Sequence, residues 1–167
     1  MKNLESPKDF VAEGGRYLCF TLGSDKFAIP LAQIKQVIGN VKTTPIPHAP
    51  QHFKGIIDLR GQIISIIDLR LKFKTTKAAN DEQNEKTIII VEFEDLQLGV
   101  LVDSVDMVTT FEGKDLSPPP NVDSKGSANF ISAVAKSDKN LTLIVNLQLA
   151  LSAEDQKTLR SPNVRSA

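Results

Sequence analysis

The segment Phe53-Lys-Gly-Ile-Ile-Asp-Leu-Arg-Gly-Gln-Ile-Ile-Ser-Ile-Ile-Asp-Leu-Arg-Leu-Lys-Phe73 decides the fold of this chain. Its isoleucines form two short runs on either side of Arg60-Gly61-Gln62, which predicts two strands joined by a tight turn. The second run leaves little polar surface, so we expect that strand to be covered on both faces. Arg60 then lies on an exposed turn of a rigid hairpin, where a core does not need a charge and a binding surface does.

Composition limits the class of protein. The chain has 167 residues, of which 41% are hydrophobic, and this predicts a globular domain with a full core. The formal net charge of zero argues against a nucleic-acid-binding surface. The start of the chain lacks the apolar core of a signal peptide, and the single cysteine cannot form an internal disulfide. We therefore expect a cytoplasmic protein in which Cys19 is a small buried hydrophobe.

The chain shows the same series of elements twice. Each half is predicted to hold two strands, a short helix, a Pro-rich loop and a hairpin, and the polar segment 74–86 is predicted to be the loop between the halves. In the first half these elements are strands 17–22 and 27–29, helix 31–38, loop 44–50 and the Ile-rich hairpin. In the second half they are strands 88–93 and 97–102, helical spacing through 105–108, loop 112–129 and strands 130–135 and 141–145.

Individual residues also match between the halves. Ala28 aligns with Gly99, Val37 with Val108, and Phe53 with Phe130. Any two β-rich segments can be aligned in this way, but the shared order of elements favours a duplication. Because small sheets bury little surface alone, we expect a mainly β protein with two small closed barrels, of about five strands each, packed together. The predicted boundaries are a flexible tail at 1–16, lobes at about 17–74 and 87–151 within a domain 17–152, and a C-terminal helix and tail at 153–167.

The two halves differ in charge. Residues 17–74 hold eight Lys and Arg against three Asp, and residues 87–151 hold nine Asp and Glu against four Lys. One interpretation is chance together with mutual attraction of the lobes. The other is that the lobes present complementary surfaces for end-to-end assembly with similar barrels.

The titratable residues do not suggest catalysis. His48 and His52 have a spacing that suits a metal on a helix, but Pro47 and Pro50 argue against a helix there. Asp58 and Asp68 each begin an Asp-Leu-Arg triplet, so an ion pair or a turn hydrogen bond is a simpler role than a catalytic carboxylate pair. We therefore expect a binding module without enzymatic activity, metal or cofactor. The alternative is a small-molecule-binding or hydrolytic β-barrel protein, which would need a polar cavity in one lobe.

Together, the motifs resemble those of the CheW-like chemotaxis coupling proteins over roughly residues 16–152. Each motif alone is weak, and their order and spacing together are specific. The motifs are Tyr17-Leu-Cys-Phe-Thr-Leu22, Phe27-Ala-Ile-Pro30, Pro45-Ile-Pro47, Phe53-Lys-Gly-Ile-Ile-Asp-Leu-Arg-Gly61, Ile66-Ile-Asp-Leu-Arg-Leu-Lys-Phe73, Gly99-Val-Leu-Val-Asp103, and Pro118-Pro-Pro120 before Phe130.

The resemblance implies two SH3-like five-stranded barrels packed on a shared hydrophobic core, and a non-enzymatic adaptor. Such an adaptor would join the cytoplasmic helical hairpin tips of chemoreceptors to the regulatory domain of a CheA-type histidine kinase, and would be recruited to receptor arrays at the membrane without inserting into it. Carried over by position, Gly55 and Arg60 match family positions tied to receptor and kinase coupling. The other candidate interaction residues are expected to lie near these contacts: Gln36, Val37, Ile38, Ile56, Asp58, Leu59 and Gly61. Three further residues are candidates for a receptor groove, although a core role is equally open for them: Val102, Val105 and Val108.

Three positions depart from the family pattern. Gln36 stands where the family usually has Glu, Ile38 where it has Arg, and Asp58 where it has Asn before Leu-Arg-Gly. None is a core position by pattern, so we expect the fold to survive and the choice of partner to change. The alternative is therefore a divergent paralogue that serves another chemosensory-like pathway. A CheV-type coupling protein is rejected, because its receiver domain would have no room in residues 153–167.

Overall fold

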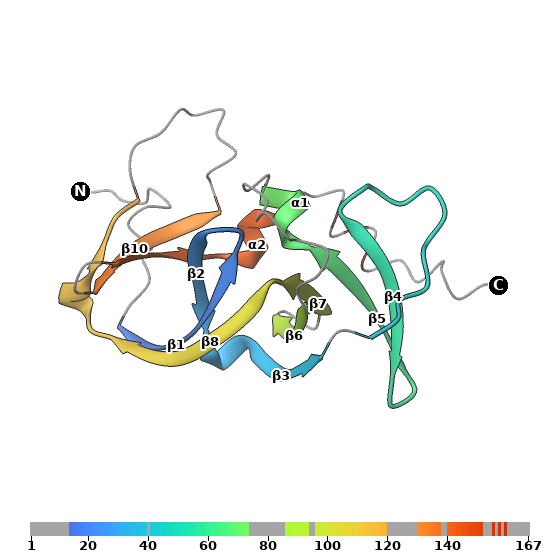
Figure 1. Cartoon of the computed structure of the whole chain (residues 1–167), viewed down its shortest axis with the longest axis horizontal. Coiled ribbons are helices and arrows are strands. Elements are labelled where there is room, and N and C mark those ends of the chain that lie inside the picture. Colours follow the sequence, from blue (N-terminus) through green and yellow to red (C-terminus); the bar gives the residue numbers. More distant parts are fainter. Residues whose placement is uncertain are drawn as a thin grey trace.

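The computed structural model describes residues 14–39, 41–73, 86–93, 96–119, 130–137 and 140–151, together with Asp155, Lys157 and Leu159. The described chain is mainly β structure and is arranged as two sheets that lie side by side (Figure 1). Residues 74–85 of the predicted loop, most of the N-terminal tail and most of the C-terminal helix and tail lie outside the described residues. No helix in the described part of the chain is long and apolar enough to cross a membrane.

In the part of the chain that the structure describes, eleven strands make up the two sheets. Sheet A has the order β8 (Ser104–Phe111), β1 (Gly15–Leu22), β2 (Asp25–Pro30), β11 (Asn140–Val145), β10 (Ile131–Ser137) and β9 (Leu116–Ser117). Sheet B has the order β3 (Ile34–Gly39), β6 (Thr87–Phe93), β7 (Leu96–Val102), β5 (Gln62–Asp68) and β4 (Phe53–Leu59). Short helical elements lie between or after these strands: η2 (Leu31–Gln33), α1 (Leu69–Phe73), η4 (Gly113–Asp115) and α2 (Leu147–Ala150).

Each sheet takes one hairpin from the other half of the sequence. Hairpin β1–β2 belongs to the first half of the sequence and pairs in sheet A with strands of the second half, whereas hairpin β6–β7 makes the reciprocal exchange in sheet B. Ala28 lies opposite Ile144 in the parallel pair β2–β11, and Gly99 lies opposite Ile66 in the parallel pair β7–β5. The predicted lobes 17–74 and 87–151 therefore describe the repeat in the sequence and not the membership of the sheets. The charge of a sequence half is, for the same reason, not the charge of a lobe.

The two predicted helices after β2 and β7 are wrong. Residues 34–39 form strand β3, paired antiparallel with β6, and residues 104–111 form strand β8, paired antiparallel with β1. Along β3 the residues alternate between half-buried and exposed, which is the period of a strand. The apolar spacing of three and four that suggested a helix combines Leu31, on η2, with residues of a β-branched strand.

Three apolar clusters fill the molecule. One cluster lies inside the curl of sheet A and contains Tyr17 and Cys19, and another lies inside sheet B and contains Ile88 and Ile90. The third is shared by both sheets and takes the alternate residues of the same strands, such as Phe20 from β1 and Val91 from β6. Strands β1 and β6 are therefore buried on both faces, which explains their nearly continuous apolar sequence. The predicted pair of filled lobes on a shared core is confirmed.

The opening hairpin follows its prediction except near the turn. In β5, Ile66 packs inside sheet B and Ile67 in the shared core, so the end of the strand is covered on both faces. Ile63, next to the turn, is 49% exposed. The reason is geometric, because the hairpin tip extends beyond the neighbouring strand, whose pairing with β5 begins at Ser65.

Candidate partner-binding site

The turn between β4 and β5 is a two-residue turn that matches the twist of the hairpin. Both central residues have positive φ, 56° at Arg60 and 86° at Gly61, as expected of a type I′ turn. Asp58 Oδ1 accepts the backbone N–H of Gly61 at 2.8 Å, which confirms the predicted turn hydrogen bond. Arg60 is exposed at the tip, so its guanidinium is presented by a supported backbone.

Gly55 has a structural task in the same hairpin. Its φ is 144°, and a Cβ at this position would collide with the carbonyl group of Thr44. That close approach forms an isolated β-bridge in which Thr44 and Ile56 exchange both backbone hydrogen bonds at 2.9 Å. The segment after β3 thereby reaches β4 and brings the two edges of sheet B together. Gly55 is buried, and its missing side chain allows this closure.

Two of the departures from the family pattern, Gln36 and Ile38, lie on one face of strand β3. Gln36 and Ile38 are half-buried, whereas Lys35 and Val37 alternate with them and are exposed. Ile38 packs against the apolar cluster inside sheet B, and Leu59 of β4 packs against the same cluster. Ile38 therefore contributes to the core, contrary to the expectation from pattern alone. The structure brings β3 and the β4–β5 hairpin onto one lobe.

The three groove candidates have different environments. Val102 is fully buried in the shared core, where it presents no surface to a partner. Val105 is partly buried and packs against the same core. Val108 is 41% exposed on β8, the edge strand of sheet A, and its repeat counterpart Val37 is 43% exposed on β3, the edge strand of sheet B. Of the three valines, Val108 alone has a largely exposed side chain.

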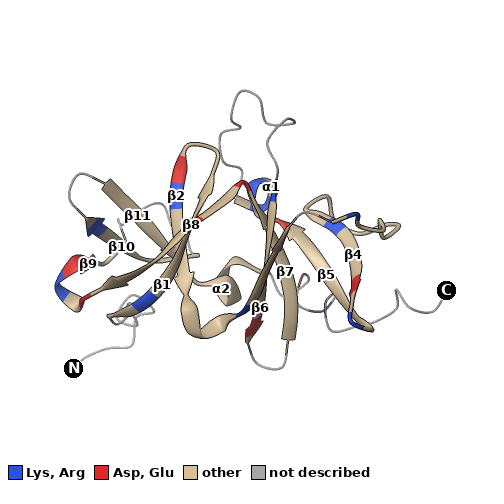
Figure 2. Cartoon of the chain, turned by 60° about the horizontal axis from the view of Figure 1, so that its bottom comes forward, with Lys and Arg blue, Asp and Glu red and all other residues tan. Residues whose placement is uncertain are grey.

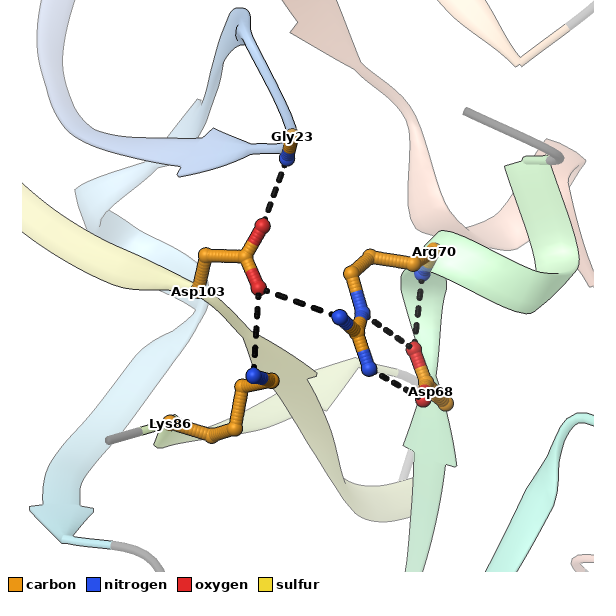
Figure 3. A network of polar contacts seen from close by, with 5 residues as sticks. All are labelled: Gly23, Asp68, Arg70, Lys86 and Asp103. Atoms are coloured by element: carbon orange, nitrogen blue, oxygen red, sulfur yellow. Dashed lines mark hydrogen bonds and ion pairs between the residues drawn. The ribbon is translucent and has the colours of Figure 1, made fainter. Parts of the chain in front are cut away.

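A buried ionic network lies where the chain passes between the sheets (Figure 3). Arg70 Nη2 lies 3.3 Å from Asp68 Oδ2, which confirms the predicted ion pair, and Arg70 Nη1 lies 3.4 Å from Asp103 Oδ1. Lys86 Nζ lies 3.8 Å from the same oxygen of Asp103. The other oxygen of Asp103 accepts the backbone N–H of Gly23, in the β1–β2 turn, at 2.5 Å. The sequence indicated the pair within the triplet, but the contacts to Asp103 depend on the tertiary fold.

His52, Lys72 and Cys19 also have structural partners. His52 Nε2 lies 2.9 Å from Asp155 Oδ1, and Lys72 Nζ lies 2.6 Å from Asp155 Oδ2, so the buried Asp155 joins the C-terminal segment to sheet B. Burial raises the pKa of the Cys19 thiol. The thiol donates a hydrogen bond to Thr109 Oγ1 at 3.7 Å, and this bond lowers the pKa and offsets part of the rise. Cys19 is 8% exposed and is the small buried hydrophobe that was predicted.

Comparison with known proteins agrees with this architecture. The family model described as "CheW-like domain" matches residues 16–155. The chemotaxis protein CheW of Klebsiella aerogenes is 28% identical over 142 residues, which cover 85% of this chain and 84% of that protein. CheW of Rhizobium meliloti is 28% identical over 88% of this chain and 94% of that protein.

A solved structure has the same fold. The crystal structure of the scaffolding protein TtCheW from Thermoanaerobacter tengcongensis superimposes with a TM-score of 0.75 at 29% identity, covering 85% of this chain and 95% of that one. The family match spans most of the chain, and both repeats of the duplicated fold lie within it. This chain belongs to the CheW-like domain family.

Proposed function

We propose that this chain, a chemotaxis coupling adaptor by its family, joins the cytoplasmic hairpin tips of chemoreceptors to the regulatory domain of a CheA-type histidine kinase. The Arg60 turn, with Asp58 and Gly61 as its support, is the central contact in this proposal. Coupling of this kind requires surfaces that hold two proteins together, and it does not require a nucleophile. The adaptor therefore works without catalysis. Binding to the receptors recruits it to membrane arrays.

The observation that carries the proposal is the backbone conformation of Arg60. A first turn position with positive φ favours Asn, Asp or Gly, because any other side chain there costs about 1 kcal/mol. Folding stability alone would therefore not select arginine. An exposed guanidinium on a turn fixed by Asp58 instead suits recognition of a carboxylate or of carbonyl groups on a partner.

Strand β3 supplies the second part of the proposed surface. Val37 is exposed at the free edge of sheet B and offers an apolar contact, and Gln36 lies next to it. Leu59 and Ile56 are half-buried and support the hairpin beneath these contacts. Because Gln36 and Ile38 replace a charged pair that the family usually carries, we propose that this surface selects a different receptor or kinase from those of typical members.

The test is affinity purification of the tagged chain from its native cell, followed by identification of the proteins that it retains. The proposal expects a histidine kinase and chemoreceptors in the eluate, and their loss with Arg60→Glu. The matched control is Lys136→Glu, which places the same charge change at an exposed position on sheet A. Circular dichroism shows whether each variant is folded. Retention of both partners by folded Arg60→Glu would place the interface elsewhere.

A further inference from the structure

A pocket of about 350 Å³ on sheet B does not include the Arg60 turn. Four of its eight lining residues are basic, and neither Arg60 nor any acidic residue is among them. The basic residues are Lys42, after β3, Lys54 on β4, Arg70 on α1, and Lys86, before β6. Figure 2 shows the basic segments on α1 and along β4. Tertiary structure alone assembles this cluster, since its members are spread over 45 positions of the sequence.

Two of the four cations form ion pairs with carboxylates that lie outside the pocket. Arg70 is paired with Asp68 and Asp103, and Lys86 with Asp103, and these carboxylates do not line the pocket (Figure 3). Both cations are therefore fixed and largely neutralised by partners outside the cavity. Their side chains are 13% and 9% exposed, which prevents them from turning toward bulk water.

The other two cations supply an excess of positive charge. Lys42 and Lys54 are exposed at the mouth of the same pocket, and neither forms an ion pair with another residue that the structure describes. Thr43 adds a hydroxyl group to the lining, and Ile66 adds apolar surface. Two unpaired ammonium groups beside a hydroxyl form a site for an anion, and the apolar wall suits the methylene groups of an acidic side chain.

We propose that this pocket binds a carboxylate side chain, glutamate or aspartate, of an acidic segment in a partner protein, chiefly through Lys42 and Lys54. The carboxylate affinity follows from the charges of the pocket. That its source is a partner protein rests on the proposed adaptor function, because an adaptor meets other proteins and no substrate. The pocket is a second recognition surface on sheet B, in addition to the Arg60 turn.

The experiment is a titration of the full chain with an acetylated oligoglutamate peptide at low ionic strength, followed by ¹H–¹⁵N correlation spectra. The expected result is saturable binding with shifts centred on the amides of residues 41–43, 54 and 86. Lys42→Gln combined with Lys54→Gln should weaken binding by roughly tenfold, because both unpaired charges are lost. The matched control, Lys114→Gln combined with Lys136→Gln, removes the same charge from exposed positions on η4 and β10 and should leave binding unchanged.

Other outcomes would overturn the proposal. Equal weakening by the control variant would show nonspecific attraction, and equal binding of an oligoglutamine peptide would show that carboxylates are not recognised. Tighter binding of inorganic phosphate than of oligoglutamate would assign the pocket to phosphate instead. The shifts are read at the amides of residues 41–43, 54 and 86, none of which lies in the Arg60 turn, so failure at the Arg60 surface and failure at this pocket are distinguishable.

Discussion

Arg70 reaches from the start of α1 to Asp103, at the junction of β7 and β8, and its Nη1 lies 3.4 Å from Asp103 Oδ1. Asp103 in turn accepts the N–H of Gly23 in the β1–β2 turn of sheet A, so a single carboxylate links the two sheets. The exchange of hairpins and the apolar packing do not by themselves fix the position of the β1–β2 turn. The ionic network around Asp103 also holds this turn against sheet B.

We predict that Asp103→Ala lowers the free energy of unfolding by about 3 kcal/mol. The variant leaves the N–H of Gly23 without its acceptor and removes a carboxylate from two largely buried cations, Arg70 and Lys86. Urea denaturation followed by circular dichroism measures the change. The control is Asp106→Ala, whose pair with Lys26 is partly exposed and should contribute less than about 1 kcal/mol. Equal losses in the two variants would contradict the role of the network.

Gly55→Ala should destabilise the protein by about 2 kcal/mol or more, because the added methyl group meets the backbone of Thr44 and φ is 144°. Gly39→Ala is the matched control, since its Cβ would lie in open space at the end of β3. Thermal unfolding of both variants separates the two cases. A Gly55→Ala protein of native stability would mean that sheet B can close without the Thr44–Ile56 bridge.

Arg60→Gly should distinguish the role of Arg60 in the turn from its role as a contact with the partner. Glycine adopts positive φ at no steric cost, so we expect the stability of the variant to stay within about 1 kcal/mol of the parent or to rise. Its affinity for the histidine kinase should nevertheless fall by roughly tenfold or more, as for the loss of a charged contact. Isothermal titration calorimetry and urea denaturation give the two quantities. A stable variant that binds normally would remove Arg60 from the interface.

Asp58→Ala offers the complementary test. It removes the acceptor of the Gly61 N–H and leaves Arg60 in place, so the expected loss of stability is about 1 kcal/mol. Binding should weaken less than in Arg60→Gly, because the guanidinium is retained but less well positioned. Asp25→Ala, an exposed carboxylate in the β1–β2 hairpin, is the control for loss of charge. A larger binding defect in Asp58→Ala than in Arg60→Gly would make Asp58 itself the contact.

Cys19 should react slowly with thiol reagents in the folded protein. Its raised pKa means that less thiolate is present at pH 8 than for a free cysteine, and its burial limits access. The folded state holds the proton more tightly than the unfolded state, so this group reduces stability as the pH rises above the unfolded pKa. The rate of reaction with a disulfide reagent, with and without denaturant, tests both effects. A native rate equal to the denatured rate would exclude a buried thiol.

Several features of the fold could be predicted because they depend on local chemistry. The isoleucine runs around Arg60-Gly61 indicated a hairpin, since β-branched residues and a turn residue of positive φ both act locally. The Asp-Leu-Arg triplets indicated an ion pair or a turn hydrogen bond for the same reason, and the structure shows the hydrogen bond at Asp58 and the ion pair at Asp68. The helix predicted at 31–38 failed because η2 and β3 together imitate the apolar spacing of a helix, and only pairing with β6 distinguishes the two.

The sequence by itself determined the class of fold, the duplication and the exposed arginine turn, because each of these follows from residue type and spacing. Tertiary structure decided which hairpin joins which sheet, because β1–β2 and β6–β7 have equivalent patterns and either assignment satisfies them locally. It also decided that Val102 is core, that Gly55 faces Thr44, and that Lys42, Lys54, Arg70 and Lys86 share one pocket. These relationships join residues far apart in the chain, and pairing of strands across both halves is what brings them together.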